Sequence, residues 1–429
     1  MSAYPELPGA PHLRYAQGEL MLEGCRLGDL ARRFGTPLYV YSQAAIRDSV
    51  LAYQAALSAQ PHLLCYAVKA NSNLAILKLM SDLGCGFDIV SGGELDRVLA
   101  AGASAQRVVF SGVGKTCAEM AQALRAGVQC FNVESEAELH VLSHVAQTEE
   151  LVARISLRVN PDVDAKTHPY ISTGLKSNKF GIPHEQAERL YVLAASLPGI
   201  EVDGIDCHIG SQITDSAPYL DALDRVLDLV EAIETRGLTI RHLDIGGGLG
   251  IRYVDEQPPT PGELLAQVLR RLRDRGHAQR RLLLEPGRSL VGNAGVLLSE
   301  VLYLKPAMGE DGKHFCVVDA GMNDLLRPTL YDAYMQIVPC TPRPGAMPDW
   351  EVVGPVCETG DWLGHARALN VTAGDYLAVL SAGAYGMSMA SHYNTRGKPA
   401  EVLVAANQAR LIRRRESPAD LYAAEQGLD

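Results

Sequence analysis

The side chain with the most specific chemistry to offer is Lys69, which directly follows the apolar run 63–68. A short run of this composition predicts a buried strand. A lysine at the carboxyl end of a strand can present its amine to a ligand while packing fixes its stem, as covalent attachment of a carbonyl compound requires. The alternative is an ordinary lysine that ends a strand, and only the rest of the chain can decide between the two.

Two further segments offer groups that a charged ligand needs. Residues 246–250 read Gly-Gly-Gly-Leu-Gly after an apolar run, and backbone without side chains lets amide N–H groups close around a phosphate. Glu285 ends another apolar run and precedes Pro286, Gly287 and Arg288. A carboxylate in that position needs a cationic or N–H partner. The partner is either Arg288, in an internal ion pair, or a ligand such as a pyridinium nitrogen.

His208 and Ser211 follow a third apolar run. The histidine is either a structural residue or a ring that lies flat against an aromatic ligand, with Ser211 reaching toward a phosphate. A lysine amine, a phosphate cradle and a carboxylate for a ring nitrogen together indicate pyridoxal 5′-phosphate. The ring of this cofactor acts as an electron sink when its nitrogen stays protonated.

These groups fall on a repeating pattern of strands and helices. The apolar strand candidates alternate with helical patterns and span residues 63–68, 86–90, 107–111, 130–133, 153–159, 202–208, 240–245 and 281–284. Alternating strands and helices predict parallel strands with crossover helices, and eight such units predict a (β/α)8 barrel. An open doubly wound sheet is disfavoured because no GxGxxG motif follows the first strand. Polar residues follow the candidate strands, as the catalytic end of a barrel requires: Lys69, Asp88, Ser111, Glu134, Arg158, His208, Gly246 and Glu285.

The chain changes character after residue 291. Its later strand candidates are short, rich in Val and separated by Gly, Pro and Asp, and they cover residues 315–319, 351–356, 376–380 and 401–405. This pattern predicts a mostly antiparallel β-domain. We therefore expect an α/β plus β architecture, with N-terminal strands in residues 1–36 that join the β-domain, a barrel over residues 37–291 and the β-domain over residues 292–429.

Composition narrows the function classes. The 429 residues carry a formal charge of −11, with 47% hydrophobic and 21% charged residues, which argues against nucleic acid or an anionic membrane as the main partner. The nine cysteines form no CxxC pair and indicate reduced thiols rather than a disulfide framework. We expect a cytoplasmic protein without a signal peptide, a transmembrane span or a metal site.

Several longer motifs carry a resemblance to a known family. They cover residues 66–73, 88–95, 168–176, 179–182, 285–288, 327–331, 357–359 and 383–389. Over nearly its whole length the chain resembles fold-type III pyridoxal-phosphate enzymes and, within them, the diaminopimelate decarboxylase family. The segment 391–398 departs from the family pattern at His392, where an asparagine is expected, and at Gly397, where a proline is expected.

The resemblance implies roles for particular residues. Lys69 would hold the aldehyde of the cofactor, His208 would stack on its ring, and Glu285 would pair with its nitrogen. The other residues expected around the cofactor are Asp88, Ser211, Gly246, Gly247, Gly248, Pro286, Gly287, Arg288 and Tyr385. The residues expected to bind substrate are Arg288, Arg327, Tyr331, Glu358 and Tyr385. Cys357 would be the general acid that reprotonates the carbon after carbon dioxide leaves, which suits a thiol whose ordinary pKa is near ~8.5. The alternative for Cys357 is a buried apolar cysteine.

The expected reaction is decarboxylation of meso-2,6-diaminopimelate to L-lysine, the last step of lysine biosynthesis. The distal end of this substrate carries a carboxylate and an ammonium group, which Arg327 and Glu358 would bind. A decarboxylase for another basic amino acid or for carboxynorspermidine is the nearest alternative. A racemase would need an acid–base group on each face of the cofactor, and a non-catalytic pyridoxal-phosphate binder would need only the barrel.

The resemblance also implies a homodimer with shared active sites, in which the partner's β-domain supplies Cys357, Glu358 and Tyr385. Residues 176–180 lie in a long polar connection after the fifth strand candidate and are a candidate lid.

Overall fold

The computed structural model describes residues 6–164, 178–309 and 312–425. It divides into two compact units, which we call the barrel unit (Ser49–Ile251 and Gln257–Ser289) and the β unit (Met1–Asp48, Arg252–Glu256 and Leu290–Asp429). The motif at residues 168–176 and the first two residues of the candidate lid at residues 176–180 lie outside the described residues.

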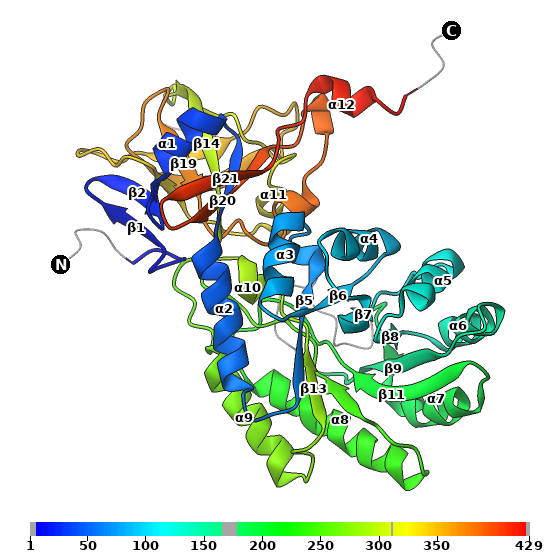
Figure 1. Cartoon of the computed structure of the whole chain (residues 1–429). Coiled ribbons are helices and arrows are strands. Elements are labelled where there is room, and N and C mark those ends of the chain that lie inside the picture. The colour runs from blue at the N-terminus through cyan, green and yellow to red at the C-terminus, as the bar shows by residue number, and fades with distance from the viewer. Residues whose placement is uncertain (1–5, 165–177, 310–311, 426–429) are drawn as a thin grey trace. The chain divides into compact units, whose positions relative to one another are not determined.

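The barrel unit is built on a closed ring of parallel strands (Figure 1). In order around the ring these are β5 (His62–Ala67), β6 (Gly86–Ile89), β7 (Val108–Phe110), β8 (Cys130–Val133), β9 (Ala153–Asn160), β11 (Ile200–Asp206), β12 (His242–Asp244) and β13 (Arg281–Leu284). β13 pairs with β5 and β8 pairs with β9, so the ring closes, while the two-residue β10 (Ile182–Pro183) runs beside β9. The predicted barrel is confirmed, and each ring strand overlaps one of the predicted strands.

Helices cover the outside of this ring (Figure 1). They are α3 (Leu74–Asp82), α4 (Gly92–Ala100), α5 (Cys117–Ala126), α6 (Glu136–Thr148), α7 (His184–Ser196), α8 (Ala217–Thr235) and α9 (Pro261–Asp274). Several begin at a side-chain cap that accepts a hydrogen bond from a backbone N–H of the first turn, namely Asn73, Ser91, Thr116, Ser135 and Thr260. Four of these caps come within a few residues of the preceding strand, so they keep the strand-to-helix loops short at the end of the barrel where the polar residues gather.

The β unit contains a large sheet and a small one. The large sheet runs β18 (Trp362–Ala368), β17 (Asp349–Val353), β15 (Phe315–Val318), β14 (Gly295–Lys305), β4 (Leu38–Ser42), β20 (Ala400–Ala405) and β21 (Gln408–Arg413), with β19 (Tyr376–Val379) on β14 and β16 (Ile337–Pro339) on β19. Only the β15–β17 and β4–β20 pairs within it are parallel, so the predicted mostly antiparallel β-domain is confirmed. β21 lies at the edge of this sheet.

The N-terminal strands form the small sheet. β1 (Leu13–Ala16), β2 (Glu19–Leu22) and β3 (Cys25–Arg26) pair in sequence order and lead into α1 (Leu27–Phe34). Leu13, Leu20 and Leu22 are buried in one cluster with Val296 of β14 and Val402 of β20. The predicted union of the N-terminal strands with the β-domain is therefore made through a shared core, while β4 joins the large sheet directly.

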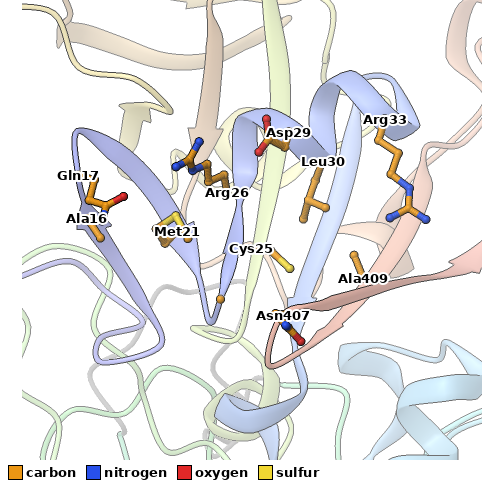
Figure 2. Close-up of a pocket in the computed structure, with 11 residues that line it drawn as sticks. Ala16, Gln17, Met21, Cys25, Arg26, Asp29, Leu30, Arg33, Asn407 and Ala409 are labelled. Carbon is orange, nitrogen blue, oxygen red and sulfur yellow. The ribbon is translucent and has the colours of Figure 1, made fainter.

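A pocket of about 540 Å³ opens in the β unit between the small sheet, α1 and the β20–β21 turn (Figure 2). Its walls include Met21, Cys25, Leu30, Arg33 and Asn407. None of the residues predicted to do chemistry lines it, so this pocket is separate from the candidate site. Among the described residues, no helix is long and apolar enough to cross a membrane.

Candidate active site

The lysine at the end of the first barrel strand is held by a buried carboxylate. Lys69 lies in the 3-10 turn η1 (Val68–Ala70) that follows β5, and its Nζ donates to Oδ2 of Asp88 at 2.9 Å. The strand register pairs Ala67 with Asp88, which brings the end of β5 beside that carboxylate. The Asp88 side chain is fully buried, whereas that of Lys69 is 39% exposed. The amine is therefore fixed in position and still open to a ligand.

The segment after the last barrel strand packs against the same turn. The amide of Ala67 donates to the carbonyl oxygen of Pro286 at 3.1 Å. A Cβ on Gly287 would lie 3.0 Å from the Cβ of Ala70 and 3.1 Å from the Cβ of Ala67, closer than side chains normally approach. The Pro-Gly pair therefore fits directly against the segment that carries Lys69, and a side chain at position 287 would require that segment to shift by a few tenths of an ångström.

The glycine run forms a tight loop after β12. Gly246 and Gly248 have φ values of +68° and +102°, a region that favours glycine. A Cβ on Gly247 would lie 2.1 Å from the carbonyl oxygen of Glu285. The three carbonyl oxygens of Gly246, Gly247 and Gly248 accept hydrogen bonds from Glu285 N, Tyr219 Oη and Ile213 N respectively. These oxygens are therefore engaged within the barrel unit, and so is the amide of Gly246, which donates to Oδ1 of Asp244 at 2.9 Å.

A neutral histidine lies beside this loop. The amide of Gly247 donates to Nδ1 of His208 at 3.2 Å, so that nitrogen carries no proton. Burial lowers the pKa of His208, and the positive charges of Arg158 and Lys69 lower it further. The buried Arg288 donates from Nη2 to Oγ of Ser211 at 3.1 Å. A neutral ring and a cation beside a hydroxyl suit the flat and anionic parts of one ligand.

Three carboxylates converge behind these groups. Oxygen atoms of Asp206, Asp244 and Glu285 all lie within 4.8 Å of one another, and the three residues are buried. Burial raises the pKa of Glu285, and the neighbouring charges of Asp244 and Asp88 raise it further. Burial also raises the pKa of Asp244, to about 6. Carboxylates this close and this dry cannot all ionise, so the cluster retains protons at neutral pH.

Sequence reasoning missed Asp206, Asp244 and Asn132 as part of this site. Asn132 is fully buried on β8 and donates from Nδ2 to Oε1 of Glu285 at 3.2 Å. The signal that could have found the two aspartates is a charge inside an apolar strand, two residues before His208 and Gly246. Charged residues are rarely buried in a barrel strand unless they are paired or serve a function.

The cation beside this cluster is Arg158, which is buried at the end of β9. Its Nη1 donates to Oε1 of Glu134 at 3.3 Å, and its Nε lies 3.9 Å from Oδ2 of Asp206. Its guanidinium carbon lies 5.1 Å from the centre of the Phe180 ring. Arg158 therefore balances part of the negative charge that the cluster carries.

In the β unit, Arg327 is surrounded by aromatic rings. It is the first residue of α11 (Arg327–Tyr331) and is 6% exposed. Its guanidinium carbon lies 5.4 Å from the ring centre of Tyr331, 5.8 Å from that of Tyr253 and 6.0 Å from that of Tyr385. The faces of these rings attract the cation. Tyr253 was not predicted, because only the tertiary structure brings residues 252–256 into this unit.

Cys357 and Glu358 lie on the turn between β17 and β18. Cys357 is exposed, so the alternative of a buried apolar cysteine is wrong. Oη of Tyr393 donates to Oε2 of Glu358 at 3.3 Å. Thr329 of α11 donates from Oγ1 to the carbonyl oxygen of Gly360 at 2.8 Å, which ties the Arg327 helix to this turn.

The predicted site residues thus form one group in each unit. The barrel unit brings together Lys69, Asp88, His208, Ser211, Gly246, Gly247, Gly248, Glu285, Pro286, Gly287 and Arg288. The β unit carries Arg327, Tyr331, Cys357, Glu358 and Tyr385.

The barrel group fits pyridoxal 5′-phosphate. The amine of Lys69 can attach its aldehyde, and the side-chain-free loop at residues 246–248 can approach its phosphate. The buried Glu285, whose pKa burial raises, can face its ring nitrogen. The neutral ring of His208 can lie against its pyridine ring.

Comparisons with known proteins also indicate a pyridoxal-phosphate site. A family described as pyridoxal-dependent decarboxylase, pyridoxal binding domain, matches residues 43–292. The diaminopimelate decarboxylase of Pseudomonas aeruginosa is 56% identical over 411 residues, which cover 96% of this chain and 98% of that protein. That of Vibrio cholerae is 54% identical over 408 residues, covering 95% and 97% of the two chains.

Solved structures give the same result. The structure of diaminopimelate decarboxylase from Helicobacter pylori complexed with L-lysine is 41% identical, with a TM-score of 0.88 and coverage of 93% of this chain and 99% of that chain. The structure of the enzyme from M. jannaschii in co-complex with L-lysine is 38% identical, with a TM-score of 0.92 and coverage of 98% and 99%. The chain therefore belongs to the pyridoxal-dependent decarboxylases, within the diaminopimelate decarboxylase family.

Proposed function

We propose that this protein removes carbon dioxide from meso-2,6-diaminopimelate and releases L-lysine. The observation that carries the choice of substrate is the pair of opposite charges in the β unit. Arg327 is a buried cation among three tyrosines, and Glu358 is an exposed anion on the turn tied to the Arg327 helix. A distal carboxylate and a distal ammonium group match this pair, whereas an ornithine-like side chain offers no group for Arg327.

Pyridoxal phosphate, when bound, supplies an electron sink for the carbon that loses carbon dioxide. The barrel residues would orient and hold it. Nζ of Lys69 is the point of attachment, and Asp88 keeps that nitrogen at the barrel mouth. Glu285 would hold a proton at the ring nitrogen, and the amide of Asn132 fixes the Glu285 carboxylate for this task.

The β-unit residues would bind the substrate and return a proton. We assign Arg327, Tyr331 and Tyr385 to the distal carboxylate and Glu358 to the distal ammonium group. The Sγ–H of Cys357 would deliver the proton to the carbon that carbon dioxide has left, as its exposed position on the same turn permits. Arg288 and Ser211 would bind the anionic groups of the cofactor and the substrate at the barrel mouth.

A parallel substrate assay tests this function. Purified protein with added pyridoxal phosphate is offered meso-diaminopimelate, ornithine, arginine and carboxynorspermidine, and both carbon dioxide and amine products are identified. We expect lysine from diaminopimelate and at least a roughly hundredfold lower kcat/KM for the others, since two charge-assisted contacts are lost. Comparable turnover of ornithine would overturn the assignment of Arg327 and Glu358.

We further propose a cytoplasmic homodimer with shared active sites. The nine free cysteines suit a reducing compartment. If each site takes Lys69 from one subunit and Cys357 from the other, mixing inactive Lys69→Ala and Cys357→Ala proteins should restore about a quarter of the wild-type activity. Half of randomly mixed dimers are hybrids, and each hybrid has one intact site. No recovery after verified subunit exchange would exclude a shared site.

A further inference from the structure

The turn that carries Cys357 and Glu358 belongs to no helix or strand, yet its backbone is tightly bonded from within. The amide of Glu358 donates to the carbonyl oxygen of Val356 at 2.8 Å, and the amide of Asp361 donates to that of Glu358 at 3.0 Å. Asp361 is 4% exposed, and its Oδ2 accepts from the amide of Val356 at 2.6 Å. Its Oδ1 accepts from the amide of Met322 at 2.6 Å. One buried carboxylate thus anchors the base of the turn.

The exposed side of the turn is held by a different segment. The amide of Cys357 donates to Oδ1 of Asn394 at 2.7 Å, and Oη of Tyr393 donates to Oε2 of Glu358 at 3.3 Å. Both partners belong to the short 3-10 segment η5 (Tyr393–Thr395). Two adjacent residues of this segment therefore contact the two adjacent residues that the proposed function places in the site.

The backbone conformation of this segment and the hydrogen bonds of its flanking residues support these contacts. Asn394 has a φ of +56°, a left-handed conformation that asparagine tolerates better than most residues. The amide of Ser391 donates to the carbonyl oxygen of Asn323 at 2.8 Å, and Arg396 donates from Nη2 to that of Asp319 at 2.6 Å. His392, one of the two departures from the family pattern, contacts Oε2 of Glu416 at 2.7 Å through its Nε2. This contact of His392 is with Glu416 rather than with the turn that carries Cys357 and Glu358.

We infer that Asn394 and Tyr393 are positioning residues, which aim the thiol of Cys357 and the carboxylate of Glu358 respectively. This inference rests on the proposed function for the roles of those two groups. A hydrogen bond to the amide of Cys357 fixes the peptide plane before it and so limits the directions in which the thiol can point. A hydrogen bond to Glu358 selects one orientation of an exposed carboxylate. That bond also raises the pKa of the Tyr393 hydroxyl.

Three variants separate the contributions. Asn394→Gly keeps a backbone that tolerates positive φ but removes the acceptor. Asn394→Asp keeps the acceptor and adds a charge beside Cys357. Tyr393→Phe keeps the ring and removes the hydroxyl. All three are assayed as the cofactor-loaded full chain, with thermal unfolding as a check that the fold is intact.

The kinetic expectations differ between the two positions. Asn394→Gly should lower kcat roughly 10- to 100-fold with KM changed less than about threefold, because a misplaced thiol slows the chemistry rather than binding. Asn394→Asp should recover kcat to within about fivefold of wild type at its optimal pH, because the acceptor is restored. Tyr393→Phe should raise KM for diaminopimelate roughly three- to tenfold with kcat changed less than about twofold.

Alkylation of Cys357 by iodoacetamide, followed by peptide mass spectrometry, gives a readout that does not depend on turnover. Cys117, the other exposed cysteine, serves as the internal reference. In Asn394→Asp the midpoint of Cys357 alkylation should move up by as much as about one pH unit, because the new carboxylate disfavours the thiolate. The Cys117 profile should not move.

The outcomes distinguish the inference from the proposed function. Wild-type kcat in Asn394→Gly, beside an inactive Cys357→Ala, would overturn the positioning role and leave the function intact. Wild-type kcat in Cys357→Ala would overturn the proposed acid, and the alkylation profile would then decide the positioning role alone. An unmoved Cys357 midpoint in Asn394→Asp would overturn that role.

Discussion

The barrel holds two layers of largely buried polar side chains, and they differ in how well their hydrogen bonds are satisfied. The lower layer consists of Cys130, Ser156, Asp203 and His242. Ser156 Oγ lies 2.9 Å from His242 Nε2 and 3.3 Å from Cys130 Sγ, and His242 Nδ1 lies 3.1 Å from Asp203 Oδ2. Every buried side-chain oxygen and nitrogen of this layer has a hydrogen-bond partner among the described residues.

The upper layer lies two or three residues further along the same strands and consists of Asn132, Arg158, Asp206 and Asp244. Here both carboxylate oxygens of Asp206, Oδ2 of Asp244 and Oδ1 of Asn132 are buried and receive no hydrogen bond from an N–H or O–H group of the described residues. Residues two apart on a strand point to the same face, and an irregularity in β11 between Val202 and Gly204 accounts for the three-residue step there, so one set of strands builds both layers. The hydrogen-bonded lower layer therefore contributes to stability. The upper layer has buried oxygens without donors, and a bound ligand or shared protons can satisfy them.

The lower layer also contains a Ser–His–Asp arrangement that is not catalytic. Ser156, His242 and Asp203 are connected in the manner of a hydrolytic triad, but Ser156 is 0% exposed. A Cβ on Gly204 would overlap the His242 ring at 2.1 Å, so the ring fills the barrel interior. A nucleophile that no substrate can reach serves packing and hydrogen bonding instead.

The largest expected effect comes from the upper end. Lys69→Arg keeps a cation beside Asp88 but removes the primary amine, so kcat should fall at least about 10³-fold, equal to roughly 4 kcal/mol of transition-state stabilisation. Carbon dioxide release and the visible absorbance of the attached cofactor measure this. Ser156→Ala, in the lower layer, is the matched control and should retain that absorbance. Equal loss in both variants would erase the distinction between the layers.

The lower layer should instead control stability. His242→Leu removes the ring that links Ser156 to Asp203, which keep only their contacts with Cys130 and Arg241 respectively, and we expect the free energy of unfolding to fall by about 2–4 kcal/mol. Urea unfolding of the cofactor-free protein measures this. The kcat of the folded fraction should stay within about threefold of wild type. A variant that is fully stable, or stable but inactive, would contradict the assignment of this layer to stability.

Removing one carboxylate from the cluster of Asp206, Asp244 and Glu285 should stabilise the protein but weaken cofactor binding. Asp206→Asn removes one of three crowded carboxylates and supplies an amide donor to the others, so we expect the free energy of unfolding to rise by about 1–2 kcal/mol. The affinity for pyridoxal phosphate, measured by titration, should fall in the same variant. Destabilisation by Asp206→Asn would show that its contact with Arg158 outweighs the repulsion.

The two layers should also respond to pH with opposite signs. The hydrogen bond from His242 lowers the pKa of Asp203 to about 2. Its stabilising contribution is therefore present above the unfolded value of ~3.9 and is lost as the pH falls toward 2. Burial raises the pKa of Asp244 to about 6, so the folded state keeps a proton that the unfolded chain has released, and stability falls as the pH rises from ~4 to 6.

Urea unfolding of the cofactor-free protein between pH 4 and pH 7 measures the second effect. One proton contributes a slope of at most about 1.4 kcal/mol per pH unit. Asp244→Asn should flatten the decline of wild type across this range, whereas Asp203→Asn should leave it in place. An unchanged decline in Asp244→Asn would show that other groups carry the retained proton.

Much of the architecture was readable from local pattern. Each ring strand of the barrel is a short apolar run, and each is followed by polar or glycine residues, so strand count, parallel order and catalytic end could be predicted together. Lys69, His208, Glu285 and the loop at residues 246–248 all stand at such strand ends, and the structure places them at the same end of the barrel.

Other features could not be read this way. β4 precedes the barrel in sequence but pairs with β14 and β20 of the β unit. Residues 252–256 leave the barrel unit to bring Tyr253 beside Arg327. Asn394 looks like an ordinary loop residue until its contact with the amide of Cys357 is seen.

Local sequence patterns specify the periodicity of strands and helices, the residue types at each strand end and therefore the chemistry of the barrel site. These are local properties, since a strand's faces and its end depend on residues only a few positions apart. Folding brings two further carboxylates close to Glu285, leaves several buried oxygens without a donor among the described residues, and places Asn394 against the turn of Cys357. These properties depend on burial and on contacts between residues 37 or more positions apart, and no local pattern encodes them.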